Sequence, residues 1–352
     1  QMGFSHLQVA SNGIKFADPE FTMRAAEAGL HTIYLQFDGV DDRVYKQTRG
    51  RDLLEYKLKA VEAARKAGIK IVYVPTIAKG INDDQVGKIL QFALDNIDIS
   101  SGISYQPVAF TGRISYEERQ RMRFTLPDLV RCIEEQTGIA SRDDWYPLSL
   151  CTPISKIISA LRGADTVHIS CHPHCSLGTY LFIGQKTKEA IPITRFVDVE
   201  GMFSEIDSFA EKTASSRFKR FAQMNAFYRL QKYFRKDKAP DGLDFVRFLQ
   251  TLDGFFDKNA GRGKMDGTYT SKTLLVAGMH FMDAYNFELE RVRRCVIHYA
   301  TPAGRIIPFC AYNGGFVHRT AIEDQFSITL EEYRRRMKER RQGGDGCEDF
   351  SC

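Results

Sequence analysis

The sequence predicts an α/β fold, built as a partial, incomplete parallel βα barrel followed by an α+β C-terminal domain. From residue 5 to about 113, short runs rich in β-branched and aromatic residues alternate with runs of helical periodicity. Such alternation implies right-handed βαβ crossovers and parallel strand pairing. Beyond residue 123 the alternation gives way to an irregular order of strands and longer helices, which predicts a second architecture.

The elements of the first half follow from their residue patterns. The strand segments are short and rich in Val, Ile, Tyr and Leu, whereas the helical segments repeat apolar residues every three or four positions, as Leu58, Val61 and Ala64 do. Only four strand segments are evident, without a first strand of a complete barrel. Strands are predicted over His6–Ala10, Thr32–Phe37, Lys70–Thr76 and Ile103–Ala109, and helices over Glu20–Ala28, Leu53–Lys66 and Asp83–Leu94.

The second half begins after a charged segment at 116–123, which we interpret as a loop. Thr125 and Pro127 then predict the N-cap and first turn of a helix. We therefore predict domains at 1–123 and 124–330, followed by a basic helix and mobile tail at 331–352. Strands are predicted at 166–170, 178–184 and within 272–287, a long helical region at 205–235, and a hairpin over 295–310 that turns at 302–304.

Composition and charge restrict the class of protein. The 43% apolar and 26% charged residues are ordinary for a globular chain, and no apolar run of about eighteen residues predicts a membrane span. The first residues lack the pattern of a secretory signal, which favours a cytoplasmic location. The net charge of +5 includes a basic segment at 334–341 that we interpret as a solvated helix, with anionic lipid or nucleic acid as alternatives. Of these two, we expect no nucleic-acid partner and leave contact with a membrane surface open.

Polar residues follow each predicted strand of the first half. Ligands of parallel βα sheets bind at the C-terminal ends of the strands, where these side chains could hydrogen-bond a nucleoside, its ribose hydroxyls and an attached amino-acid tail. Each single site also fits ordinary turn chemistry, because Asn, Asp and Gly tolerate positive φ. Their recurrence at successive strand ends favours the ligand interpretation. The candidate residues are Ser11, Asn12, Gln36, Asp38, Thr76 and Gln106.

The cysteines of the second half predict a metal site. Cys171 and Cys175 are four residues apart in one loop, and Cys295 and Cys310 stand at the two ends of the predicted hairpin, whose pairing brings them together. Four thiolates suit an iron-sulfur cluster or zinc, and four unrelated buried cysteines are the third interpretation. The neighbouring His172, His174 and His298 are expected to support ligands rather than to be ligands. Cys132 fits a helical face and is interpreted as structural.

Four segments together resemble the third to sixth strands of the radical S-adenosylmethionine (SAM) partial barrel: LQVASNGIK, LQFDGVDDRVYKQTRG, VPTIAKGIND and ISYQPVAFTG. The resemblance is closest to the archaeal tetraether lipid synthase group and covers nearly the whole chain. It implies that Ser11 and Asn12 face SAM from the third strand. By the same resemblance Gln36 and Asp38 contact its ribose from the fourth strand, and Thr76 and Gln106 lie on the fifth and sixth.

The resemblance also implies a function. Such an enzyme generates a 5′-deoxyadenosyl radical from SAM, abstracts hydrogen from an unactivated carbon, and in the lipid synthases joins isoprenoid chains through carbon-carbon bonds. It implies an auxiliary 4Fe-4S cluster, here held by Cys171, Cys175, Cys295 and Cys310. The expected partners are a small-molecule or lipid substrate and an electron donor such as a ferredoxin or flavodoxin.

One departure from the family is severe. The CxxxCxxC motif that holds the SAM-reducing cluster, and the Gly-Gly-Glu stretch that grips the methionine amine, precede the third strand in the family and do not occur here. We expect this chain alone to be inactive, as a fragment of a longer protein or as an inactive remnant. The alternative functions are a non-catalytic iron-sulfur or zinc scaffold and a metal-free βα-barrel enzyme.

Aromatic residues are dense between 218 and 256. We interpret them as a helical core, with an apolar groove for a long hydrocarbon substrate as the alternative. The residues are Phe218, Phe221, Phe227, Tyr228, Tyr233, Phe234, Phe245, Phe248, Phe255 and Phe256.

Overall fold

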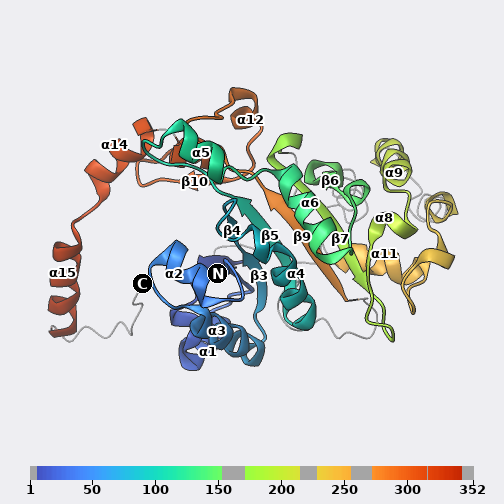
Figure 1. Ribbon diagram of the computed structural model, residues 1–352, viewed down its shortest axis with the longest axis horizontal. Coiled ribbons are helices and arrows are strands. Elements are labelled where there is room, and N and C mark those ends of the chain that lie inside the picture. Colours follow the sequence, from blue (N-terminus) through green and yellow to red (C-terminus); the bar gives the residue numbers. More distant parts are fainter. Residues whose placement is uncertain (1–5, 153–170, 215–227, 255–271, 315, 343–352) are drawn as a thin grey trace.

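The computed structural model describes residues 6–152, 171–214, 228–254, 272–314 and 316–342, arranged around one curved sheet (Figure 1). The strand order is β1-β2-β3-β5-β9-β7-β6, with β4 paired to β5 and β8 paired to β7. The first five strands of this order are parallel. The predicted α/β class with a mostly parallel sheet is thereby confirmed. The strands are β1 (Gln8–Ser11), β2 (Thr32–Gln36), β3 (Lys70–Val74), β4 (Thr76–Ile77), β5 (Ser100–Pro107), β6 (Tyr146–Pro147), β7 (Ser176–Ile183), β8 (Ala190–Pro192) and β9 (Thr273–Met279).

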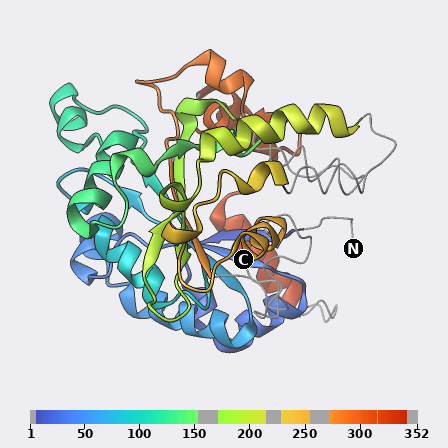
Figure 2. The same ribbon diagram turned by 90° about the vertical axis from the view of Figure 1, so that its right-hand side faces the viewer.

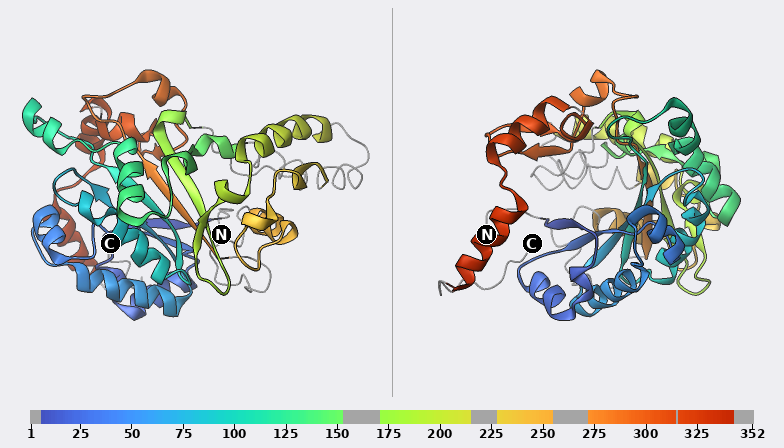
Figure 3. Two further views of the ribbon diagram at one scale, coloured as in Figure 1. Left: turned by 45° about the vertical axis from the view of Figure 1, so that its right-hand side comes forward. Right: turned by 60° about the vertical axis from the view of Figure 1, so that its left-hand side comes forward.

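Helices cover one face of the parallel strands, and Figure 3 shows them along the outer side of the curved sheet. Alternate strand residues such as Ile33, Leu35, Ile71 and Tyr73 point to this face and are buried in the first core. The predicted helices are present with ends shifted by up to three residues, and a 3-10 turn over Asp83–Gln85 precedes α4. The helices of the first half are α1 (Pro19–Glu27), α2 (Asp42–Arg49), α3 (Leu54–Ala67), α4 (Val86–Asp95), α5 (Tyr116–Met122) and α6 (Leu126–Thr137).

Helices α1, α2, α5 and α6 each begin at a residue whose side chain caps them. Thr125 and Asp128 form a capping box at the start of α6, at the predicted N-cap. The charged segment predicted as a loop is instead helix α5, because the Ser115 hydroxyl accepts a hydrogen bond from the backbone N–H of Glu118 and caps it. The Ser-x-x-Glu spacing was a readable start signal.

The sheet continues past residue 123. Strand β9 pairs in parallel with β5, with Gly102 opposite Leu275, and β7 pairs antiparallel with β9, with Ser176 opposite Met279. The chain therefore returns to the first sheet from the second half. The division into domains at residue 123 stays a prediction. Of the other predicted strands, β7 and β9 are present, while 166–170 lies outside the described residues.

A second core lies beyond β7, on the side that Figure 2 turns to the viewer. It contains Phe182, Phe196, Phe234, Phe245 and Phe248, whose rings lie 5.3 to 6.4 Å apart. This agrees with the helical-core interpretation for the aromatic residues described; 215–227 and 255–271 lie outside the described residues. The helices around this core are α8 (Ile193–Phe196), α9 (Val199–Ala214) and α11 (Phe245–Gly254).

The C-terminal part forms the predicted hairpin and a row of helices. Strands β10 (His298–Ala300) and β11 (Ile306–Pro308) pair antiparallel, with Gly304 in the turn at φ +71°. Within the described residues, no helix combines the length and apolar character needed to cross a bilayer. The helices are α12 (Leu289–Arg293), α13 (Phe309–Gly314), α14 (Phe316–Phe326) and α15 (Leu330–Gln342), the last of which is the predicted basic helix.

Candidate functional site

The predicted nucleoside-binding residues lie at the C-terminal edge of the parallel strands. Gln36, Thr76 and Gln106 belong to neighbouring strands and point away from the helix-covered face, where each stays partly exposed. Thr76 pairs directly with Gln106 in the register of β4 and β5. The structure therefore brings these three side chains onto one open surface of the sheet.

Ser11 and Asn12 lie at the end of β1 and organise a turn. The hydroxyl of Ser11 accepts from the N–H of Gly13 at 3.0 Å, and Asn12 Oδ1 accepts from the N–H of Ile14 at 3.0 Å. Gly13 has a φ of +79°. Both side chains thus make the local contacts that the turn interpretation predicts, and their role as SAM ligands stays a prediction.

Asp38 is fully buried and ties three segments together. Its carboxylate accepts hydrogen bonds from Arg49 Nε at 2.9 Å, from the N–H of Thr76 at 3.0 Å and from the Gln36 amide. The Asn82 side chain donates to the backbone carbonyl of Asp38 at 2.9 Å. Since these groups occupy the carboxylate from several sides, Asp38 fixes the ends of β2 and β3 relative to each other.

A lysine that the sequence analysis missed lies beneath this surface. Lys57, on α3, is fully buried, and its ammonium donates to the carbonyl of Asn12 and to Gln36 Oε1, the latter at 3.0 Å. Its Nζ also lies 5.6 Å from the centre of the Tyr45 ring. Burial lowers the pKa of Lys57 to about 8, with Asp38 opposing and Arg49 reinforcing the shift. Lys57 therefore positions two of the predicted SAM-binding residues.

The four predicted cysteine ligands lie near one another. Burial raises the pKa of the Cys171 thiol, the Ser176 hydroxyl lowers it, and Cys175 and Cys295 raise it again. Likewise, burial raises the pKa of Cys310, the N–H of Met282 lowers it, and Cys295 and Cys175 add to the rise. Hydrogen bonds hold the segments that carry these cysteines together: the N–H of His280 donates to the Cys175 carbonyl at 2.9 Å, the N–H of Met282 donates to Cys310 Sγ at 3.4 Å, and Arg291, four residues before Cys295, donates to Cys175 Sγ at 3.4 Å.

The spacing of these sulfurs bears on the kind of metal. Among the described residues, no three His, Cys, Asp or Glu side chains are gathered tightly enough to hold a single ion. Zinc bonded to sulfur at about 2.3 Å requires ligand atoms roughly 4 Å apart, whereas a four-iron cluster is larger and separates its ligands further. The choice between zinc and an iron-sulfur cluster at Cys171, Cys175, Cys295 and Cys310 stays a prediction.

Two other residues complete the surroundings of the cysteines. Arg291 is buried and donates from Nε to Cys175 Sγ at 3.4 Å. The N–H of His280 donates to the Cys175 carbonyl at 2.9 Å, and burial, followed by Arg291 and Arg123, lowers the pKa of His280 to about 4. The N–H of Cys175 in turn donates to the His172 carbonyl at 2.9 Å, so both His280 and His172 contact Cys175 through the backbone, and the supporting role predicted for His172, His174 and His298 stays a prediction.

The two groups of residues share one edge of the sheet. Strand β9 ends at Met279 beside the end of β5, and β7 starts opposite it, immediately after Cys175. In Figure 1 the hairpin, α12 and α5 lie together at this end of the molecule. Three strand spacings separate β2 from β9, or about 14 Å along the sheet.

A buried ion pair links the two groups. Asp283, 1% exposed, bonds Arg123 at 2.8 Å and accepts the N–H of Phe110, which follows β5. Burial raises the pKa of Asp283, but Arg123 and the backbone donors outweigh it and lower the pKa overall. The loop after β9, which holds Met282 against Cys310, is thereby fixed to the end of β5.

The residues that sequence analysis missed are mostly cations. Lys57 and Arg291 look in the sequence like ordinary solvent-facing residues of charged helices, and only tertiary packing buries them. His280 and Asp283 did carry a readable signal, because they lie within four residues of the end of the apolar strand β9, just as Ser11 and Gln106 lie at the ends of β1 and β5.

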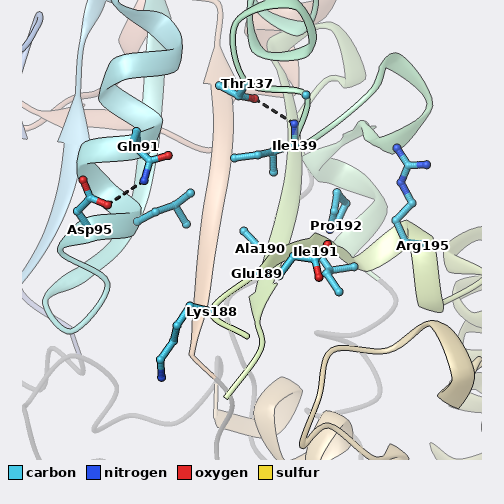
Figure 4. A pocket seen from close by; sticks show the side chains of 12 residues that line it. Gln91, Asp95, Thr137, Ile139, Lys188, Glu189, Ala190, Ile191, Pro192 and Arg195 are labelled. Atoms are coloured by element: carbon cyan, nitrogen blue, oxygen red, sulfur yellow. Dashed lines mark hydrogen bonds between the residues drawn. The ribbon is translucent and has the colours of Figure 1, made fainter. Parts of the chain in front are cut away.

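A pocket of about 740 Å³ lies at the opposite edge of the sheet (Figure 4). The ends of α4 and α6 and the β7–β8 turn surround it, with Gln91, Thr137, Lys188 and Arg195 in its lining. Gln91 is engaged with Asp95 at 2.8 Å. Because this pocket lies away from the strand ends and cysteines, it belongs to neither predicted site.

Known proteins resemble this chain in sequence. A sequence model of the Radical SAM superfamily matches residues 3–93. A 7,8-dihydro-6-hydroxymethylpterin dimethyltransferase of Methanocaldococcus jannaschii is 40% identical over 344 residues, which cover 96% of this chain and 66% of that relative. GTP 3',8-cyclases of Paracoccus denitrificans and Pseudomonas putida are 29% and 32% identical over 129 and 120 residues, or 36% and 33% of this chain and 36% and 34% of those enzymes.

These relatives support the superfamily that the sequence predicted, whereas the resemblance to tetraether lipid synthases stays a prediction. The chain spans about two thirds of the dimethyltransferase and about a third of each cyclase. The parallel βα sheet agrees with these matches, and the chain belongs to the radical SAM superfamily.

Proposed function

We propose that this chain contributes the SAM-binding strands and an auxiliary 4Fe-4S site to an enzyme that abstracts hydrogen from an unactivated carbon. The observation that carries the proposal is the shared edge of the sheet. Polar side chains of successive strands lie there together with four neighbouring thiols and a buried guanidinium. The proposed SAM contacts are Ser11, Asn12, Gln36, Thr76 and Gln106, and the buried Asp38 positions Gln36 and Thr76.

The auxiliary site is proposed from its donor set. Cys171, Cys175, Cys295 and Cys310 are free thiols at the ends of a loop and a hairpin, and Arg291 supplies positive charge beside them. Soft thiolates in a set of four select an iron-sulfur cluster or zinc, and the resemblance to the radical SAM family favours the cluster. When bound, such a cluster supplies one-electron chemistry next to the substrate. An electron donor such as a ferredoxin or flavodoxin would serve it.

The cluster that reduces SAM needs ligands outside this sequence. Its CxxxCxxC ligands are not among the residues of this sequence, so these residues cannot hold it. We therefore propose that the chain alone does not cleave SAM. What its own residues do is bind and orient: Lys57 holds Asn12 and Gln36, and Asp38 holds Thr76.

Iron and sulfide analysis tests the auxiliary site. After anaerobic reconstitution of the full chain, we expect equal iron and sulfide and a broad charge-transfer absorption. Cys171→Ser or Cys310→Ser should lower the iron and sulfide contents. Cys132→Ser, a change on α6 away from the hairpin, should leave them unchanged. Zinc without sulfide, or uptake that neither ligand variant changes, would contradict the proposal.

Nucleoside binding separates an enzyme domain from a non-catalytic scaffold. We expect the reconstituted chain to bind S-adenosyl-L-homocysteine in calorimetry, and Gln106→Ala to weaken binding roughly fivefold, as one hydrogen bond of about 1 kcal/mol requires. Gln91→Ala, at the opposite edge, is the matched control. A chain that binds the cluster but no nucleoside would support the scaffold instead.

Two substrate classes have separate support. The name of the 40% identical relative points to methyl transfer to a reduced pterin. The resemblance to lipid synthases points to carbon-carbon coupling of isoprenoid chains, and one observation favours it: large apolar side chains around Cys295 are exposed. They include Leu289 at 64%, Ile306 at 73% and Val296 at 43% exposure.

Binding measurements distinguish these classes. We would titrate the chain with 7,8-dihydro-6-hydroxymethylpterin and, separately, with micelle-dispersed isoprenoid ether lipid. The substitutions Leu289→Ser and Ile306→Ser should weaken lipid binding and leave pterin binding unchanged. Saturable pterin binding without lipid binding would remove the lipid alternative.

A further inference from the structure

Arg291 is a buried cation that donates a hydrogen bond to a cysteine sulfur. It lies on the short helix α12 and is 5% exposed, although the neighbouring Arg293 points into solvent. Its Nε donates to Cys175 Sγ at 3.4 Å, and its terminal nitrogen donates to the His280 carbonyl at 2.5 Å. Its charge also reaches Cys310, whose pKa it lowers against the effect of burial. One guanidinium therefore acts on a sulfur from the loop and a sulfur next to the hairpin.

The nearby carboxylates are engaged elsewhere. Glu290 pairs with Arg293 at 2.5 Å, and Asp283 pairs with Arg123 at 2.8 Å. Among the described residues, no carboxylate lies within ion-pair distance of Arg291. A buried guanidinium is costly unless an anion compensates it, and a neutral thiol does not. The site is therefore built for anionic sulfur.

We propose that Arg291 raises the reduction potential of the auxiliary cluster, through its hydrogen bond to Cys175 Sγ and its positive charge; this rests on the proposed function of the four cysteines. A cluster bound by four thiolates gains one negative charge on reduction. A fixed cation and an N–H···S bond stabilise that more negative state, because both act more strongly where water is excluded. Arg291 is a charge-compensating residue, not a ligand.

The test is a redox titration of the reconstituted full chain, followed by electron paramagnetic resonance. Arg291→Met keeps an apolar stem of similar length and removes the charge and both donors, whereas Arg291→Lys keeps the charge and loses the planar fork. Arg293→Gln is the matched control on the same helix. We expect Arg291→Met to lower the potential enough to reduce the ratio of reduced to oxidised cluster at least tenfold at a fixed potential, about 59 mV for one electron. Arg291→Lys should restore part of this shift, and Arg293→Gln should match the wild type.

The outcomes are separable because iron and sulfide are measured in every sample. A wild-type chain that takes up no iron and sulfide refutes the proposed cluster and the role of Arg291 with it. A full cluster in Arg291→Met at the wild-type potential refutes the role of Arg291 alone. Loss of the cluster in both Arg291 variants but not in Arg293→Gln would make Arg291 an assembly residue and overturn the proposal.

Discussion

The buried Lys57 makes a prediction about stability and pH. In the folded chain burial lowers its pKa to about 8, whereas in the unfolded chain it titrates near its ordinary value of about 10.4. Between these values the unfolded chain binds more protons, so the free energy of unfolding rises with pH across that window. The shift corresponds to about 3 kcal/mol, a cost that is fully present below pH 8 and disappears above about pH 10.5.

The perturbation is Lys57→Met, which keeps an apolar stem in the same space and cannot titrate. Removing the ammonium also deprives the Asn12 carbonyl and Gln36 Oε1 of a donor, a loss of roughly 1 to 3 kcal/mol that does not depend on pH. In urea denaturation, we expect the free energy of unfolding of the wild type to rise by about 2 kcal/mol relative to that of the variant between pH 7.5 and 10. Other titrating groups cancel because both proteins carry them. A difference that stays flat across this range refutes the reasoning.

Two further changes test packing around the sheet. Asp283→Asn should lower the free energy of unfolding by about 3 kcal/mol in urea denaturation, because it leaves the buried Arg123 charge without its partner, and a loss under 1 kcal/mol would contradict this. Gly102→Ala should cost about 1 to 3 kcal/mol, because the added Cβ would meet the Leu275 carbonyl oxygen at 2.9 Å between β5 and β9. Exposed Ser101→Ala on the same strand is its control, and equal stability of the two variants would show that the strands separate freely.

The fold was predictable where local pattern and tertiary structure agree. The strand and helix segments up to residue 109, the cap at Thr125 and the hairpin over 298–308 all follow from short-range signals. Sequence could not predict the return of β9 to the side of β5, since that pairing joins residues about 170 apart and no local residue specifies it. For the same reason the shared edge of the two predicted sites emerged only in three dimensions.

The candidate site divides in the same way. Polar residues at strand ends and paired cysteines carry their chemistry in their type and spacing, so sequence finds them. The chemistry of Lys57 and Arg291 depends instead on their burial, and that burial depends on which residues pack over them in the fold. Ionic side chains on helices are usually solvated, and sequence reasoning correctly assigns that default.

Lys57 and Arg291 are both buried at the same edge of the sheet. Each is buried at the C-terminal edge of the sheet, one under the strand ends and one beside the sulfurs, and neither forms an ion pair with a carboxylate in the part of the chain that the structure describes. A fold selected for stability alone would replace them with apolar residues of similar volume, because desolvated charges generally cost more than they return. Their retention at one edge is therefore best explained by ligands. Asp38 and Asp283 compensate Arg49 and Arg123 at the same edge, whereas Lys57 and Arg291 donate to neutral groups and a thiol, so we expect these two cations to favour the binding of anionic groups.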